Sequence, residues 1–477
     1  MVSTAPASST NAWARAIAQP AREFAATPLK LLQGQLPPNL RGSLYRNGPG
    51  RLERGGTTMG HWFDGDGGLL RVHFTGESAT ATYRYVQTQG YQEETRAGRL
   101  LWGGYGMLPP GSLWERFSKT LKNPANTSVI ALEDRLLALW EGGSPHALTP
   151  DTLDTIGLET PRGLEGIPYS AHPKRDPGTG DIFNFGITFG LKGILNVYRS
   201  DARGTLLQKA TVSLPGFPVI HDFVLAGRYL VFCVPPVRMQ ALPVLARLQS
   251  YSDSLEWQPE AGSEIIVIDR DTLQVVCRLA AEPWYQWHFG NGYELPDGSI
   301  TLHIARYPDF QTNQRLKEVA SQELKTPAIS TLWQLRIDPQ TQKILEWQEV
   351  LNRSCEFPVV HPAQVGQPHR YTYLSTHSAS ADTLQELFNG IARFDHETGN
   401  LTEAALAETL YPSEPIVAPD AANPQQAWIV TVVYNSVADR SEVLVFDSDH
   451  LDTGPVCSLE LPRVIPHSFH GTWQGNP

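Results

Sequence analysis

The feature that most constrains the fold is a turn that recurs along the chain. A short apolar strand runs into an aspartate, two or three polar residues follow, and a second strand begins. The aspartate can close such a turn by accepting a hydrogen bond from the backbone two residues further on. This pattern occurs seven times, at Asp64, Asp151, Asp201, Asp269, Asp338, Asp395 and Asp447.

The spacing of these turns favours a β-propeller. Neighbouring turns are separated by 87, 50, 68, 69, 57 and 52 residues. Antiparallel hairpins repeated at a quasi-regular period are typical of propeller blades. Seven turns in 477 residues give about 68 residues per unit, more than the roughly 40–45 of a minimal blade, which leaves room for long loops. Because similar turns occur in other all-β proteins, the repeat alone leaves another all-β architecture open.

Strand patterns dominate the rest of the chain. Residues 228–234, 264–269 and 427–434 are short segments rich in β-branched and aromatic residues, bounded by Gly, Pro or Asp. Helical periodicity is confined to residues 11–26, 112–122 and a segment near 311–324. No linker rich in Pro, Gly and Ser divides the sequence, so we expect residues 1–25 to form an N-terminal tail or docking helix and residues 26–477 to form a single domain.

Charge and cysteine content exclude several classes of protein. With 38 Lys and Arg against 49 Asp and Glu, the net charge is −11, which argues against nucleic-acid binding and against adhesion to anionic lipid by charge alone. No apolar run approaches the roughly 20 residues of a membrane helix. The four cysteines are far apart and form no C-x-x-C pair, and the N-terminus lacks the apolar core of a secretory signal. We therefore expect a cytoplasmic protein.

Four of the fourteen histidines stand in rigid, apolar or aromatic surroundings: His172, His221, His288 and His470. A buried imidazole needs hydrogen-bond partners or a metal. Separations of 49, 67 and 182 residues place the four on different strands, and in a propeller such strands converge on the central axis. Spacing alone does not select them, because a histidine beside aromatics is more often a core residue. The other candidates are His61, His146, His303, His361 and His377.

Eight short motifs distinguish these four histidines from the other candidates, and the motifs occur in a fixed order between residues 36 and 474. They are Arg46-Asn-Gly-Pro-Gly50, Phe63-Asp-Gly-Asp-Gly67, Leu139-Trp-Glu-Gly-Gly143, Ser170-Ala-His-Pro173, His221-Asp-Phe223, Cys355-Glu-Phe-Pro358, Glu414-Pro415 and His470-Gly471. Together they resemble the carotenoid cleavage oxygenase family, closest to its cyanobacterial apocarotenoid, retinal-forming branch. The first two motifs are best interpreted as structural turns. The resemblance implies a seven-bladed β-propeller catalytic domain with long loops and a few short helices covering the active-site face.

The resemblance also implies a non-haem Fe(II) centre. Its metal ligands would be His172, His221, His288 and His470, all at matching motif positions. Glu141, Glu356 and Glu414 would each accept a hydrogen bond from a ligand imidazole, which fixes its tautomer and orientation. Four neutral imidazoles suit Cu, Ni or Zn as well, so the choice of iron rests on the resemblance.

The implied reaction is the cleavage of a conjugated C=C bond of an apocarotenoid, with O2 as cosubstrate, into two aldehydes. Cleavage at the 15,15′ bond would give retinal. Within the same family the alternatives are cleavage at another bond, such as 9,10, or cleavage of a stilbene. A different class of function is a non-catalytic propeller binding module with structural histidines. Two departures from the family pattern bear on the site: Val219 replaces a common aromatic near His221, and Ser413 replaces a glycine before Glu414.

A polyene substrate dissolves in membranes, so its entrance needs an exposed hydrophobic patch. Residues 113–121 and 242–248 are apolar segments punctuated by Arg or Lys and bounded by Pro. We expect peripheral membrane contact through both. The sequence indicates no nucleic-acid partner and no obligate protein partner.

Overall fold

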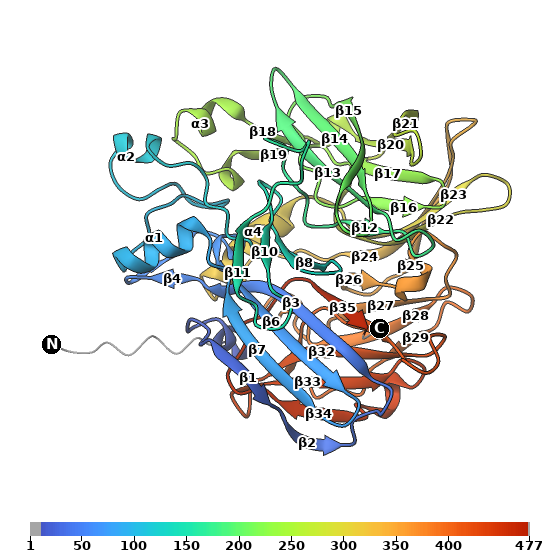
Figure 1. Ribbon diagram of the computed structural model, residues 1–477. Coiled ribbons are helices and arrows are strands. Elements are labelled where there is room, and N and C mark those ends of the chain that lie inside the picture. Colours follow the sequence, from blue (N-terminus) through green and yellow to red (C-terminus); the bar gives the residue numbers. More distant parts are fainter. Residues whose placement is uncertain (1–10, 476–477) are drawn as a thin grey trace.

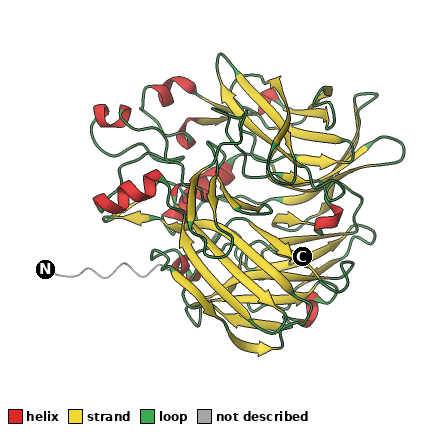
Figure 2. Ribbon diagram, viewed as in Figure 1, coloured by secondary structure: helices red, strands yellow, loops and turns green. Residues whose placement is uncertain are grey.

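The computed structural model describes residues 11–475, and strands dominate it (Figure 2). Seven antiparallel sheets of four or more strands form the blades of a β-propeller (Figure 1). Blades 2 to 6 each use four strands in sequence order from the axis outward. They are blade 2, β8 (Ser128–Ala131), β9 (Leu136–Leu139), β10 (His146–Leu148) and β11 (Thr155–Leu158); blade 3, β12 (Lys174–Arg175), β13 (Ile182–Phe189), β14 (Gly193–Ser200) and β15 (Leu206–Ser213); blade 4, β16 (Val224–Ala226), β17 (Tyr229–Val234), β20 (Ser263–Asp269) and β21 (Val275–Ala281); blade 5, β22 (Tyr285–Glu294), β23 (Ile300–Tyr307), β24 (Thr331–Asp338) and β25 (Lys343–Leu351); and blade 6, β26 (Cys355–Val359), β27 (Tyr371–Thr376), β28 (Gly390–Asp395) and β29 (Leu401–Glu403).

Blades 7 and 1 close the ring by sharing both ends of the described chain. In blade 1 the C-terminal strand pairs with an N-terminal one, at Tyr45 opposite Thr472, for example. Two further N-terminal strands extend the outer edges of these blades, β1 on β7 and β2 on β34. Blade 1 contains β35 (Gly471–Gly475), β3 (Arg41–Arg51), β6 (Asp66–Thr75), β7 (Ala79–Tyr85) and β1 (Phe24–Pro28); blade 7 contains β30 (Leu410–Pro412), β31 (Ile416–Pro419), β32 (Ala427–Asn435), β33 (Arg440–Asp447), β34 (Cys457–Glu460) and β2 (Lys30–Gly34). Two small hairpins lie outside the blades: β4 (Glu53–Arg54) with β5 (Thr57–Thr58), and β18 (Val237–Met239) with β19 (Leu255–Trp257).

Six of the seven predicted turns mark one position in the blades, the hairpin between the third and the fourth strand from the axis. In blades 3 to 7 the aspartate accepts a hydrogen bond from the amide two residues on, as predicted; these are Asp201, Asp269, Asp338, Asp395 and Asp447. Asp151 occupies the same turn in blade 2, but its carboxylate pairs with Arg71 at 2.9 Å.

The prediction of a blade hairpin at Asp64 is wrong. Asp64 lies in a 3-10 helix, η2 (Trp62–Asp64), and its buried carboxylate accepts the backbone N–H of Gly106. The corresponding hairpin of blade 1 joins β6 to β7 at Thr75, whose hydroxyl accepts the amide of Glu77, two residues on, at 3.3 Å. A threonine therefore makes the bond that an aspartate makes in blades 3 to 7.

Helices are short and lie in the loops that connect the strands. The α-helices are α1 (Gln89–Ala97), α2 (Leu113–Phe117), α3 (Ala241–Leu245) and α4 (Gln311–Ala320); the remaining 3-10 helices are η1 (Ala12–Ala16), η3 (Ser252–Ser254), η4 (Pro259–Ala261), η5 (Pro362–Gln364) and η6 (Leu451–Thr453). Figure 1 shows α1, α2 and α3 on the same side of the molecule.

The expected helix over residues 11–26 is wrong beyond its first turn. Only η1 forms, Pro20 lies in the segment after it, and strand β1 begins at Phe24. Proline cannot donate the hydrogen bond that a helix interior needs. Trp13 of η1 is nonetheless fully buried among residues from both ends of the chain. Residues 1–10 of the expected tail lie outside the described residues, and the division at residue 25 stays a prediction.

Candidate metal centre

Each of the seven blades contributes one predicted site residue at the axis. His470 precedes the inner strand of blade 1, Glu141 follows β9 of blade 2, and the remaining five lie on or just before the inner strands of blades 3 to 7: His172, His221, His288, Glu356 and Glu414. Because inner strands of a propeller converge, residues up to 329 positions apart in the sequence, from Glu141 to His470, meet in one place.

Irregular backbone directs several of these side chains inward. The pairing of β22 with β23 shifts register between Gln286 and Phe289, around His288. Phe357, next to Glu356, has a φ of 50°, and the register of β26 shifts beyond Glu356. In blade 7 the inner edge is split into β30 and β31, and Glu414 lies in the gap between them. Bulges commonly re-aim a side chain next to a functional site.

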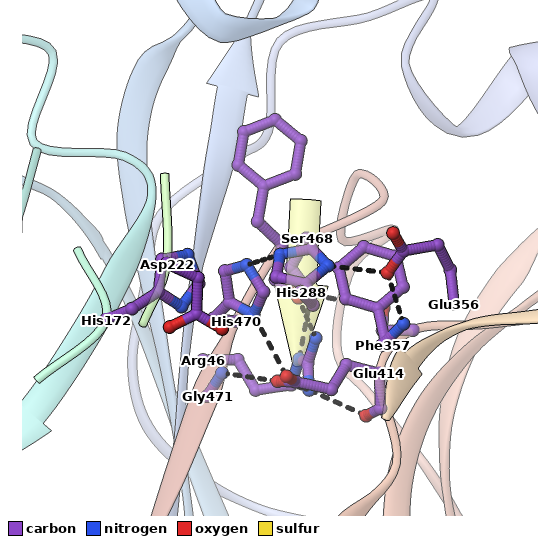
Figure 3. A network of polar contacts seen from close by, with 12 residues as sticks. Arg46, His172, Asp222, His288, Glu356, Phe357, Glu414, Ser468, His470 and Gly471 are labelled. Carbon is purple, nitrogen blue, oxygen red and sulfur yellow. Dashed lines mark hydrogen bonds and ion pairs between the residues drawn. The ribbon is translucent and has the colours of Figure 1, made fainter. Parts of the chain in front are cut away.

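The four histidines point their Nε2 atoms at one another. The Nε2–Nε2 distance is 2.9 Å from His172 to His221, 3.3 Å from His221 to His288 and 3.1 Å from His288 to His470. All four side chains are buried, and their ligand atoms lie within 4.8 Å of one another. Figure 3 shows the contact between His288 and His470, with His172 beside them. The structure therefore brings together the four histidines that the sequence selected.

Three of the imidazoles are held from behind by the predicted carboxylates. His288 Nδ1 lies 2.5 Å from Glu356 Oε2 and His470 Nδ1 lies 2.9 Å from Glu414 Oε1 (Figure 3), while His221 Nδ1 contacts Glu141 Oε1. A carboxylate only accepts, so each pair requires the proton on Nδ1 and leaves the Nε2 lone pair free toward the axis.

The carboxylates differ in their surroundings. Glu356 and Glu414 are buried, whereas the Glu141 side chain is 34% exposed and lines a cavity. Glu414 also accepts the backbone N–H of Gly471 at 2.9 Å and lies 3.6 Å from Arg46. Ser413, where a glycine was expected, has an ordinary backbone conformation and accepts a hydrogen bond from the Ser468 hydroxyl at 3.1 Å, so serine fits this turn without strain.

Burial and pairing shift the site's pKa values in opposite directions. Burial lowers the pKa of His172 well below its ordinary value, and the neighbouring imidazoles add to this. Burial also acts against protonation of His288, but Glu356 outweighs it and the pKa of that imidazole rises. Burial alone would raise the pKa of Glu414, yet His470 and Arg46 outweigh it, so this pKa falls.

A cavity of about 870 Å³ opens beside the histidines and carries a mostly apolar lining. His221, His288 and His470 form part of its wall, together with aromatic residues such as Trp140, Phe185, Trp287 and Phe469. Two of the three aromatic residues that adjoin the ligand histidines in sequence, Trp287 and Phe469, line this cavity, and Trp287 packs edge-on against His221 at 4.9 Å between ring centroids. Phe289 packs into the core between blades 4 and 5 instead.

The mouth of the cavity lies between the two predicted apolar segments. Leu121 and Leu245 line the cavity and are exposed, and the guanidinium of Arg247 donates to the carbonyl of Lys119, joining the segments. The mouth patch consists of exposed apolar side chains from α2, α3, the residues that follow these two helices, and the β13–β14 hairpin: Leu113, Trp114, Phe117, Leu121, Phe189, Leu191, Leu242, Leu245 and Leu248. Within residues 11–475 no helix is both long enough and apolar enough to cross a bilayer.

The other histidine candidates lie away from this centre. His61 and His146 are buried singly, and His361 caps the start of η5. His377 bonds Ser354 and the backbone of Glu386. His303 meets His369 and His396 in a second group, which sequence reasoning missed because the latter two stand in polar motifs, Pro-His-Arg and Asp-His-Glu.

Comparison with known proteins places the chain in a family. The model of the family described as retinal pigment epithelial membrane protein matches residues 17–475. The apocarotenoid-15,15′-oxygenase of Synechocystis sp. is 35% identical over 93% of this chain and 92% of its own. Resveratrol cleavage oxygenase 1 of Aspergillus fumigatus is 26% identical over 92% and 91%. A crystal structure of the cobalt-substituted Synechocystis enzyme superposes with a TM-score of 0.89, at 34% identity and 98% coverage of both chains. This chain therefore belongs to the retinal pigment epithelial membrane protein family and is an oxygenase of the carotenoid cleavage type.

Proposed function

We propose that residues 26–477 form a catalytic propeller that binds Fe(II) through His172, His221, His288 and His470 and uses O2 to cleave an apocarotenoid into two aldehydes. The observation that carries the proposal is the convergence of four buried Nε2 atoms within 4.8 Å, beside a large apolar cavity. The relatives named for apocarotenoid and resveratrol cleavage support the reaction class.

The donor set fits a divalent transition metal. Burial keeps the imidazole of His172 neutral, and the carboxylates behind His221, His288 and His470 fix the tautomer that presents Nε2. Neutral imidazoles suit Fe, Cu, Ni and Zn alike. Three carboxylates also balance the charge of a dication that neutral ligands leave uncompensated. Iron is favoured by the oxygenase family, and a cobalt-substituted relative has been crystallised.

The chain's own contribution to the reaction is binding and orientation. A bound ferrous ion would supply the O2 chemistry that side chains cannot perform. The apolar cavity would hold the polyene against the open side of the four-histidine cluster and exclude water. Trp287 and Phe469 line this cavity, where their π electrons would stabilise positive charge that develops on the substrate. Double-bond cleavage by O2 needs no protein nucleophile or general acid.

We propose 15,15′ cleavage to retinal as the specific reaction, because of the relative named for that bond. Val219 lines the cavity next to His221, and its small side chain leaves more room beside the centre than an aromatic would. Stilbene cleavage is the second candidate, supported by the resveratrol-cleaving relative. The cavity volume of about 870 Å³ favours the longer polyene.

Product mass analysis tests the reaction and the bond together. Iron-loaded protein would be incubated with apocarotenals of several lengths and with resveratrol. We expect retinal from every apocarotenal that retains the 15,15′ bond, with a second dialdehyde that shortens as the substrate does. A constant fragment of another length would show that a different bond is cleaved. Aldehydes from resveratrol alone would favour the stilbene reaction. An absence of products from all substrates would favour the alternative that the protein is a non-catalytic binding module.

We further propose that the mouth patch contacts a membrane surface, within the cytoplasm. The four cysteines are buried and free, which suits a reducing compartment. Trp114 is 87% exposed and Leu242 is 80% exposed, and both belong to segments that border the cavity mouth. Exposed apolar side chains around an opening would let an apolar substrate pass from lipid to protein without crossing water.

Liposome sedimentation provides the corresponding prediction. We expect the protein to bind neutral phosphatidylcholine vesicles and to stay bound in 1 M salt, since hydrophobic contact is not screened. A double variant, Trp114→Glu with Leu242→Glu, should lose most of this binding. Val437→Glu, at a 78% exposed position in the β32–β33 turn, is the matched control and should behave as wild type. Release by salt alone would instead indicate an electrostatic mode.

A further inference from the structure

A second cluster of histidines lies where blade 5 meets blade 6. His303 belongs to β23, His369 lies just before β27, and His396 directly follows β28. One nitrogen from each ring lies within 4.8 Å of the others. Within residues 11–475, this cluster and the central one are the two groups whose ligand atoms could surround a metal ion.

The Nδ1 atom of His303 has no hydrogen-bond partner in the protein interior. Its Nε2 lies 3.2 Å from Gln334 Oε1, and the amide of Gln334 is oriented because its Nε2 donates to Glu346 at 3.2 Å. Since the amide oxygen only accepts, the proton of His303 must be on Nε2. Nδ1 is therefore an unprotonated lone pair, and it is fully buried without a hydrogen-bond partner. An orphaned acceptor of this kind is costly and calls for a ligand.

The other two imidazoles share one hydroxyl. Thr372 Oγ1 lies 3.2 Å from His369 Nε2 and 2.8 Å from His396 Nε2. A hydroxyl has a single proton, so it donates to only one of these nitrogens and must accept from the other. Both rings are partly exposed, which leaves a path for an ion from solvent.

The chemical state of the cluster suits metal binding. Burial lowers the pKa of all three imidazoles, to about 4 for His369 and about 3 for His396, and neighbouring imidazoles lower the pKa of His303 and His396 further. No carboxylate belongs to the group, so the donors are three neutral imidazoles, which suit zinc and its neighbours rather than calcium or magnesium.

We propose that His303, His369 and His396 form a second metal site, for Zn²⁺ or a similar divalent transition metal, that clamps blade 5 to blade 6. Tetrahedral zinc holds imidazole nitrogens at about 2.0–2.1 Å, so the three rings must draw together from their present spacing. The ring of His396 lies over that of His303, at 3.9 Å between centroids. Because His396 is partly exposed and follows a strand end, it is the ring that can swing from stacking to coordination.

Metal counting tests this site independently of the central one. Full-length protein, as purified and iron-loaded, would be equilibrated with Zn²⁺ at micromolar concentration, desalted and analysed for zinc. We expect wild type to retain one more zinc per chain than His396→Ala or His369→Gln. Only this difference is counted, so the result does not depend on what the central site holds or on turnover. His450→Gln removes an exposed histidine and serves as the control for adventitious surface binding.

The thermal shift gives a second measurement. At one hundred times Kd, zinc should raise the Tm of wild type by about 2–3 °C, given the entropy of unfolding of a chain this size, and should leave the Tm of His396→Ala unchanged. If His396→Ala does not fold, His369→Gln takes its place, since it alters a partly exposed ring outside the strands. Equal zinc content in wild type and both variants would overturn the proposal, as would loss of zinc in His450→Gln.

Discussion

Replacing His288 with alanine should empty the central metal site and reduce cleavage activity to background, whereas Glu356→Gln should reduce metal affinity or turnover by about 10–100-fold. The difference follows from geometry. His288 supplies one of the four converging Nε2 atoms, so its loss opens the donor set itself. Glutamine at position 356 keeps an oxygen that can accept the Nδ1 proton at 2.5 Å but loses the negative charge behind the imidazole.

Metal content and turnover should be measured together in this series. Iron per chain should fall to near zero in His288→Ala and should be restored in Glu356→Gln by raising the iron concentration. Glu403→Gln, in the same blade but at an exposed ion pair with Arg353, is the matched control and should resemble wild type. Unchanged iron content and activity in His288→Ala would indicate that the four histidines are core residues of a binding module.

The local signals in this sequence predicted local structure well. An aspartate that accepts the amide two residues on makes a turn with no help from the rest of the fold, so five blade hairpins follow the predicted bond. The same reasoning failed at Asp64, whose motif has an equivalent pattern but whose carboxylate is used by Gly106. Thr75 makes the turn in blade 1 with a residue type too common to stand out.

The centre was predictable only through resemblance, for a physical reason. His172 and His470 are brought together by closure of the whole ring, which no spacing rule encodes. The register shift that places His288 also leaves no clear mark in the sequence. The sequence also leaves the exposure of the carboxylates unmarked: Glu141 is the most exposed of the three because it faces the cavity.

Arg46 links the closure of the ring to the metal centre, and its removal should cost about 3–5 kcal/mol of stability, the usual result of leaving a buried charge unpaired. The side chain is 1% exposed. Its three nitrogens donate to the Ser468 hydroxyl and to the carbonyls of Glu414 and Phe469 at 2.8–2.9 Å. Burial lowers its pKa to about 10, and the nearby Glu414 acts against this fall, so the guanidinium remains charged at neutral pH.

Arg46→Met keeps much of the side-chain volume but removes the guanidinium from the Glu414 carboxylate and from both carbonyls. We expect the Tm to fall by about 3–5 °C for a chain of this length. Because Glu414 holds His470 Nδ1 at 2.9 Å, the affinity for metal should fall in the same variant. Arg228→Met removes a half-exposed guanidinium paired with Glu294 and should cost less than about 1 kcal/mol. A normal Tm in Arg46→Met would mean that methionine packing compensates for the lost pair. A normal metal affinity would mean that His470 stays oriented without it, in which case the first motif of the sequence serves the fold alone.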